Sequence, residues 1–126
     1  MAVELIETNL RNRIWFWLEQ HREEVLDLTL RLVRIKSPQP EGDVRAMADE
    51  IEAIASEIPG VDIERYISEE PIHNLVLRLQ GNRPGKRLVF NGHMDTFPAG
   101  DLNAWTRSPE GEVVGDKAYG LGISDM

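Results

Sequence analysis

The sequence has 126 residues, 41% hydrophobic and 29% charged, which suits one globular domain with a core of its own. The formal net charge of −8 argues against nucleic acid as a partner, because a surface of that sign repels phosphate. There is no cysteine to form a disulfide or bind a metal, and neither a secretory signal nor a membrane-length apolar run is visible, so we expect a cytoplasmic protein without a membrane partner.

The first half of the chain predicts two helices. Over residues 9–35, apolar side chains at helical spacing indicate one helix with a buried stripe, formed by Leu18, Val25, Leu28, Leu32 and Ile35. A second helix is expected over residues 43–58, capped by Asp43 and ended by Pro59-Gly60. The Trp15-Phe16-Trp17 cluster cannot turn all its rings to one side, so part of it is expected to meet another surface or a second subunit.

The pattern then changes from helical to extended. Residues 61–67 and 74–80 alternate between polar and apolar side chains and predict half-exposed strands, and residues 87–91 read as a short buried strand. After Asp95 the chain is rich in glycine and proline and reads as a long loop. Helices followed by strands predict an α/β fold, with the helices packed on a mixed β-sheet.

His93 and Asp95 are the first candidate site residues. They directly follow the predicted strand at 87–91, and ligands of open α/β sheets gather at the carboxyl ends of strands. A histidine there can bind a metal through one ring nitrogen while a nearby carboxylate accepts a hydrogen bond from the other. Farther along, Gly120 and Gly122 flank a bend that could present Asp125 to a cation, although ordinary surface turns have the same composition.

Together these segments form a longer pattern. Gly92-His93-Met94-Asp95-Thr96-Phe97-Pro98, Trp105, Ser108-Pro109, Lys117-Ala118-Tyr119-Gly120 and Ser124-Asp125-Met126 occur in one fixed order. This run, with the earlier Ser37-Pro38 step, resembles the M20 family of metallopeptidases. The resemblance implies that His93 ligates a zinc ion, that Asp95 is the catalytic residue orienting this histidine, and that Asp125 bridges two zinc ions. Cobalt or manganese could replace zinc, since ligand type alone does not select among divalent ions.

The family implies an activity as well as ligands. Its members are zinc exopeptidases and deacylases, so the resemblance implies hydrolysis of an amide bond in an N-acyl amino acid or small peptide by a metal-activated water. Residues 1–126 are expected to be the amino-terminal portion of such a catalytic domain, with the remaining ligands and a dimerisation domain farther along in a homodimeric parent. The chain alone is therefore expected to be inactive and to bind zinc weakly.

Two alternatives belong to other classes. The chain could be a non-catalytic binding or scaffold domain derived from such an enzyme, with His93 and Asp95 structural. It could also be a different metal hydrolase that uses His21 or His73, although both histidines are expected at the surface, His21 among charges in mid-helix and His73 after a proline turn.

Overall fold

The structure is a computed structural model that describes residues 2–125, with side chains described from Thr8 onward. Residues 9–35 do not form the single predicted helix, because α1 (Ala2–Gln20) and α2 (Arg22–Val33) are separated at His21. The His21 ring stacks on Trp17 with 3.9 Å between centroids, and its Nδ1 lies 2.8 Å from the Trp17 carbonyl oxygen. The Trp17 carbonyl is therefore shared between this ring nitrogen and the His21 backbone N–H, 3.1 Å away, and the backbone leaves helical geometry at His21.

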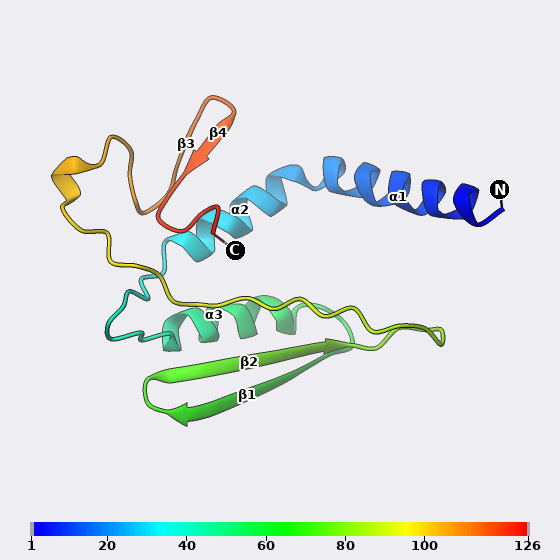
Figure 1. Cartoon of the computed structure of the whole chain (residues 1–126), viewed down its shortest axis with the longest axis horizontal. Coiled ribbons are helices and arrows are strands. Elements are labelled where there is room, and N and C mark those ends of the chain that lie inside the picture. The colour runs from blue at the N-terminus through cyan, green and yellow to red at the C-terminus, as the bar shows by residue number, and fades with distance from the viewer. Residues whose placement is uncertain (1, 126) are drawn as a thin grey trace.

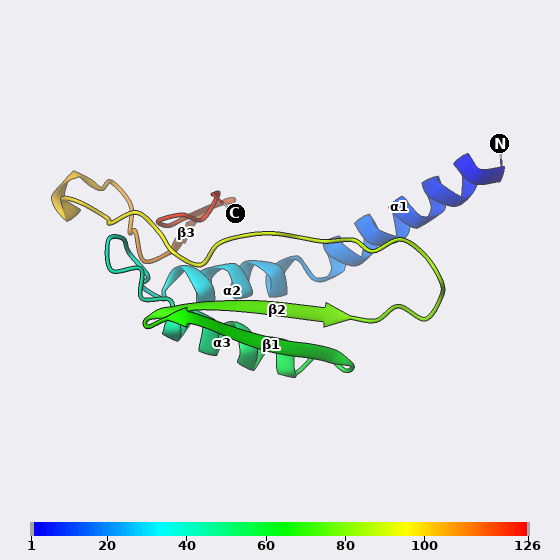
Figure 2. The ribbon, with the colours of Figure 1, turned by 60° about the horizontal axis from the view of Figure 1, so that its bottom comes forward.

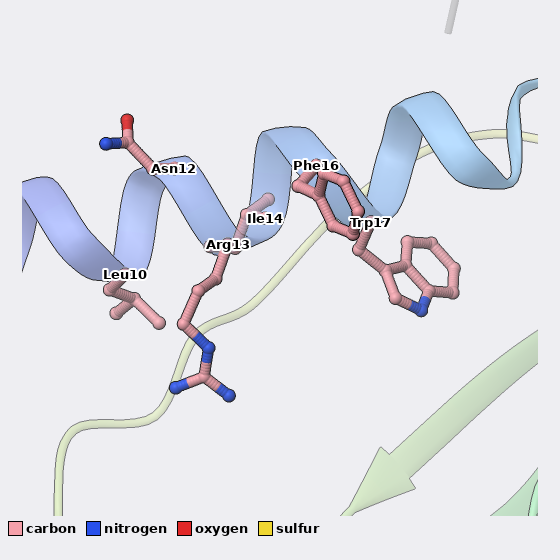
Figure 3. Close-up of a pocket in the computed structure, with 6 residues that line it drawn as sticks. All are labelled: Leu10, Asn12, Arg13, Ile14, Phe16 and Trp17. Carbon is pink, nitrogen blue, oxygen red and sulfur yellow. The ribbon is translucent and has the colours of Figure 1, made fainter.

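The predicted buried stripe exists only along α2. Leu28, Leu32 and Ile35 are partly buried and Leu30 is buried, whereas Leu18 and Val25 are exposed, so that part of the prediction was wrong. For Leu18, Figure 1 shows the reason, because α1 projects away from the rest of the described chain and has no element to pack against, whereas Val25 lies in the first turns of α2. The exposed side chains of α1 form a shallow pocket on the helix surface (Figure 3), lined by Leu10, Asn12, Arg13, Ile14, Phe16 and Trp17.

The second helix is confirmed as α3 (Arg45–Ser56). Its buried side follows the predicted apolar face and includes Val44, Met47, Ala48 and Ala55. The residue at the capping position is Val44 and not the predicted Asp43, but Asp43 Oδ1 still accepts a hydrogen bond from the Arg45 backbone nitrogen at 3.2 Å. Asp43 therefore satisfies one of the free N–H groups at the start of the helix from one position farther out.

Two of the predicted strands are confirmed as an antiparallel hairpin. β1 (Val61–Glu69) pairs with β2 (Ile72–Leu79), with Val61 opposite Leu79. The helix α3 packs against this hairpin, as both views show (Figures 1 and 2). Arg65 of β1 fastens the two layers, because its guanidinium lies 2.7 Å from Asp49 and 2.9 Å from Glu52 of α3.

The predicted strand at 87–91 is absent. These residues are extended but have no strand partner among the described residues, and Leu88, Val89 and Phe90 are all strongly exposed. An apolar pattern predicts where a strand would be buried, but a strand forms only where a neighbour offers the matching backbone groups. Figure 2 shows this segment as an extended, unpaired stretch of chain that runs above the hairpin in that view.

The long loop predicted after Asp95 contains more structure than expected. A short 3₁₀ helix, η1 (Leu102–Ala104), is followed by a second antiparallel pair, β3 (Glu112–Val114) with β4 (Lys117–Tyr119). The α/β class is confirmed, with the strands of the described chain in two antiparallel pairs and a single parallel bridge between Pro38 and Thr96. None of the helices in residues 2–125 has the length and apolar character of a membrane span.

Candidate metal centre

The loop that follows α2 holds the segment that carries His93. Thr96 donates its backbone N–H to the Ser37 carbonyl at 2.9 Å, and Gln39 donates its own to the Thr96 carbonyl at 2.9 Å. The Ser37 hydroxyl, which is fully buried, donates to the Met94 carbonyl at 2.6 Å. Three hydrogen bonds therefore fix residues 94–96 against the end of α2, although no sheet supports them.

His93 is turned so that one ring nitrogen meets Asp95. Its Nδ1 lies 2.9 Å from the Asp95 carbonyl oxygen and 3.3 Å from the carboxylate oxygen Oδ1. A backbone carbonyl and a carboxylate can only accept a hydrogen bond, so these two oxygens together favour the proton on Nδ1. In the neutral ring, Nε2 is then left with its lone pair facing outward, the arrangement that a metal-binding histidine needs.

Asp125 reaches the other nitrogen of the same ring. Its Oδ2 lies 3.3 Å from His93 Nε2, although the two residues are far apart in the sequence. A series of backbone hydrogen bonds holds this end of the chain, from Leu121 to the Pro109 carbonyl at 2.8 Å and from Asp125 to the Gly122 carbonyl at 3.0 Å. Gly122 has φ +72°, which favours glycine, and a Cβ there would lie 3.5 Å from Thr96 Cγ2, so the turn rests on the segment that carries His93.

Gly120 brings this turn onto α2. A Cβ at Gly120 would lie only 2.6 Å from Val33 Cγ1, and one at Gly111 would lie 3.3 Å from Leu30 Cδ2. The backbone on either side of the β3–β4 hairpin therefore touches the last turns of α2 at two positions that have no side chain. Both halves of the site, His93 and Asp125, are thus positioned by the carboxyl end of one helix.

The spacing of these atoms fits part of a zinc site. Two donor atoms that each lie about 2.0–2.1 Å from one tetrahedral zinc ion are about 3.3–3.4 Å apart. The separation of 3.3 Å between His93 Nε2 and Asp125 Oδ2 agrees with this value. In the described part of the chain, however, no group of three or more His, Cys, Asp or Glu side chains is placed to hold a metal ion. The residues fit a metal centre, but they supply only part of one.

The electrostatics of Asp95 suit its position. The hydrogen bond from Gln39 Nε2 to Asp95 Oδ2, 2.9 Å long, lowers the pKa of this carboxyl, and partial burial opposes it. The backbone and His93 lower this pKa further. Asp95 is therefore a carboxylate over the whole physiological range and can stabilise a positive charge on the ring or on a bound cation.

The three predicted site residues are all partly open to water, with side-chain exposures of 48% for His93, 36% for Asp95 and 63% for Asp125. The structure brings them together, and their chemical roles remain predictions. The expected setting was wrong, because the loop after α2 supports them and no strand end does. The sequence pattern included the Ser37-Pro38 step as part of a family resemblance and did not reveal that Ser37 and Gln39 hold the site.

The other two histidines do not join this group. His73 is buried, which contradicts its expected place at the surface, and both of its ring nitrogens are engaged. Arg65 Nη1 lies 3.2 Å from His73 Nδ1, and Glu70 Oε2 lies 3.1 Å from Nε2. His21 stacks on Trp17 at the helix break. Neither arrangement leaves these rings facing a common cation with carboxylates.

Comparison with known proteins identifies relatives with one shared name. The chain is 37% identical over 108 residues to a succinyl-diaminopimelate desuccinylase from Methylorubrum extorquens, covering 80% of this chain and 26% of the relative. It is 38% identical over 100 residues to the protein of that name from Cereibacter sphaeroides, covering 79% and 25%. It is 36% identical over 109 residues to succinyl-diaminopimelate desuccinylase 2 from Ruegeria sp., covering 85% and 26%.

The chain therefore spans about a quarter of the length of these curated relatives. No family model matches it, and no solved structure matches at a significant level. The relatives nevertheless agree with the family that the pattern around His93 suggested. The resemblance is confirmed, because over about four fifths of its length this chain is similar to enzymes of the M20 family.

Proposed function

We propose that this chain supplies part of the metal centre of a zinc-dependent amidohydrolase. In this proposal His93 and Asp125 are metal ligands, with Asp125 bridging two zinc ions, and Asp95 orients His93. Cobalt or manganese could serve in place of zinc, because imidazole and carboxylate donors accept all three.

One observation carries the proposal. The outward-facing nitrogen of His93 and an oxygen of Asp125 lie 3.3 Å apart, the spacing of two ligands on one zinc ion, although they belong to separate segments. The opposite nitrogen, Nδ1, is already satisfied by Asp95, so Nε2, which meets Asp125, is the ring nitrogen that can take a cation.

The chemistry of each group follows from its position. Bound divalent cations supply an activated water and polarise the carbonyl of the scissile amide. His93 and Asp125 would bind the cation, and the partly exposed position of both side chains leaves room for a substrate to approach. Asp95 keeps the His93 proton on Nδ1, so that Nε2 remains available as a ligand.

The names of the relatives indicate the substrate class. They are succinyl-diaminopimelate desuccinylases, so we propose that the whole protein releases an acyl group, succinyl first among the candidates, from the nitrogen of a small amino acid. We further propose that the whole protein is a cytoplasmic homodimer. Two ligands are too few for a closed site, so the 126-residue chain alone is expected to bind zinc weakly and to hydrolyse nothing.

A chimera tests this proposal. The matching quarter of the Methylorubrum extorquens desuccinylase is replaced by this chain, and succinate release from N-succinyl-diaminopimelate is measured with zinc present. If the chain supplies true ligands, the chimera is active, and His93→Ala or Asp125→Ala lowers kcat/KM by several orders of magnitude. His21→Ala is the matched control and should keep the activity, because its ring contacts only α1 among the contacts described.

The same chimera separates the alternative. If the segment is a non-catalytic scaffold with structural His93 and Asp95, the chimera is inactive, and His93→Ala leaves the zinc content of the purified protein unchanged. Activity that survives loss of both proposed ligands would refute the proposed function. Metal analysis of each variant shows whether a lost activity comes from lost zinc.

A further inference from the structure

The short loop after α2 does more than end a helix, because its Gln39 reaches the site directly. Gln39 Nε2 donates to Asp95 Oδ2 at 2.9 Å, while the other oxygen of that carboxylate, Oδ1, lies 3.3 Å from His93 Nδ1. The two oxygens of Asp95 thus have separate partners. One is held by an amide and the other faces the ring.

From the contact of Gln39 with Asp95 and the contact of Asp95 with His93, we propose that Gln39 is a positioning residue for the metal centre. It acts through Asp95 on the orientation and tautomer of His93. The inference rests on the proposed function for its biological meaning, but the geometry it invokes lies within this chain.

Gln39 is itself fixed at two points. Its backbone N–H donates to the Thr96 carbonyl at 2.9 Å, so the Gln39 backbone is held beside the segment that contains Asp95. Its side-chain amide lies over Gly42, where a Cβ would approach Nε2 to 3.1 Å. Gly42 has φ +57° and is buried, so the turn leaves space for the amide that a larger residue would take.

The physical consequence concerns the freedom of Asp95. A carboxylate that accepts no hydrogen bond on Oδ2 can rotate about its side-chain bond, and Oδ1 then leaves the His93 ring. The ring would retain only its contact with the Asp95 carbonyl. Loss of partners that orient a metal-binding histidine typically weakens metal binding about 10–100-fold, and Gln39 acts one contact farther away, so we expect about tenfold.

The test uses the 126-residue chain with histidine labelled by ¹⁵N and without metal. At about pH 8.5, above the ordinary histidine pKa of about 6.5, the ring nitrogen shifts report the tautomer. Wild type should show His93 with its proton on Nδ1. Gln39→Glu keeps the shape but replaces the donor by a carboxylate, and should give a mixture of tautomers. Gln39→Lys restores a donor and should return the wild-type pattern.

Gln80→Glu is the matched control, since it makes the same change of charge at an exposed residue whose amide contacts only the neighbouring Gly81 carbonyl, at 3.3 Å. The inference is overturned if Gln39→Glu leaves the His93 shifts unchanged, if Gln80→Glu alters them equally, or if the wild-type ring already exchanges between tautomers. A zinc titration is then added. In the chimera described above, a tenfold weaker zinc affinity of Gln39→Glu supports the inference, whereas a chimera that binds zinc equally well without His93 and Asp125, while the chain shows the expected shifts, would refute the proposed function alone.

Discussion

The contact between Gly120 and α2 gives a prediction whose magnitude can be worked out from the structure. An added Cβ at Gly120 would lie 2.6 Å from Val33 Cγ1, closer than unbonded carbon atoms tolerate. The next nearest atoms belong to the Gly111 backbone at 3.5 and 3.6 Å, which is ordinary contact. Val33 is therefore the one obstacle among the nearest neighbours, and Gly120→Ala must displace either the Val33 side chain or the turn that carries Asp125.

The expected cost follows from two opposing terms. Overpacking of this kind destabilises by about 1–3 kcal/mol. Replacing glycine by alanine also reduces the freedom of the unfolded chain, which stabilises by about 0.4–1 kcal/mol. The difference of the two terms is about 0–2.6 kcal/mol, and we expect Gly120→Ala to lower the free energy of unfolding by about 1 kcal/mol. Gly81→Ala is the matched control, because a Cβ there meets nothing within 4 Å, and it should be neutral or slightly stabilising.

The assay is urea denaturation of the chain at low concentration, followed by far-ultraviolet circular dichroism, in a double-mutant cycle with Val33→Ala. Removing the Val33 methyl groups makes room for the new Cβ, so the cost of Gly120→Ala should shrink by about 0.5 kcal/mol or more in that background. Equal effects of Gly120→Ala with and without Val33, or an effect no larger than that of Gly81→Ala, would show that the turn does not rest on α2.

Three further predictions concern other parts of the chain. Ser37→Ala removes the hydrogen bond from a buried hydroxyl to the part-buried Met94 carbonyl and should cost about 0.5–1.5 kcal/mol in urea denaturation, whereas Ser56→Ala, at an exposed hydroxyl, should cost little. The pKa of Asp43 is lowered from 3.8 to about 2, chiefly by hydrogen bonds from Arg45, so the stability that this carboxylate contributes is present above pH 3.8 and is lost as the pH falls toward 2. Arg45→Gln should make the free energy of unfolding less dependent on pH between these two values. An unchanged pH dependence would contradict the assignment. Phe16→Glu on the exposed face of α1 should reduce self-association, and gel filtration giving the same elution volume for wild type and variant would contradict this expectation.

The elements that the sequence predicted well are those with local patterns. The buried face of α3 and the alternation in β1 and β2 are each specified by residues close together in the sequence. The antiparallel hairpin needs only a short turn between its strands. The residues at 87–91 have an equally clear apolar pattern but form no strand, because pairing depends on a neighbour that the local sequence does not specify.

The small hairpin after Asp95 was missed for a different reason. Its strands have three residues each, which is too short for an alternating pattern to stand out. A signal was nevertheless present in Gly115-Asp116, a dipeptide that joins the strands of tight hairpins, and Gly115 has the expected positive φ of 64°. Turn chemistry was therefore a better guide to this element than hydrophobic periodicity.

The site shows the same division between residue chemistry and geometry. The ordered pattern that resembles a known family was enough to select His93, Asp95 and Asp125 as candidates, and an imidazole beside carboxylates suits a cation whatever the fold. The pattern could not reveal that the support comes from α2, since Ser37 and Gln39 are joined to the site only by hydrogen bonds across a long stretch of sequence. The sheet edge that was expected to organise the centre takes no part in holding these residues.

Because both proposed ligands are positioned by α2 and the loop after it, the distance between them depends on two separate attachments. Residues 94–96 are fixed by hydrogen bonds to the loop after α2, and the turn before Asp125 is fixed by packing of Gly120 on Val33. A shift of α2 therefore moves both proposed ligands together, and their separation changes less than either position does. Damage to one attachment, in contrast, separates His93 from Asp125 directly. Variants at Ser37 and at Gly120 should thus weaken metal binding by the same route, although they lie in different segments and touch neither ligand.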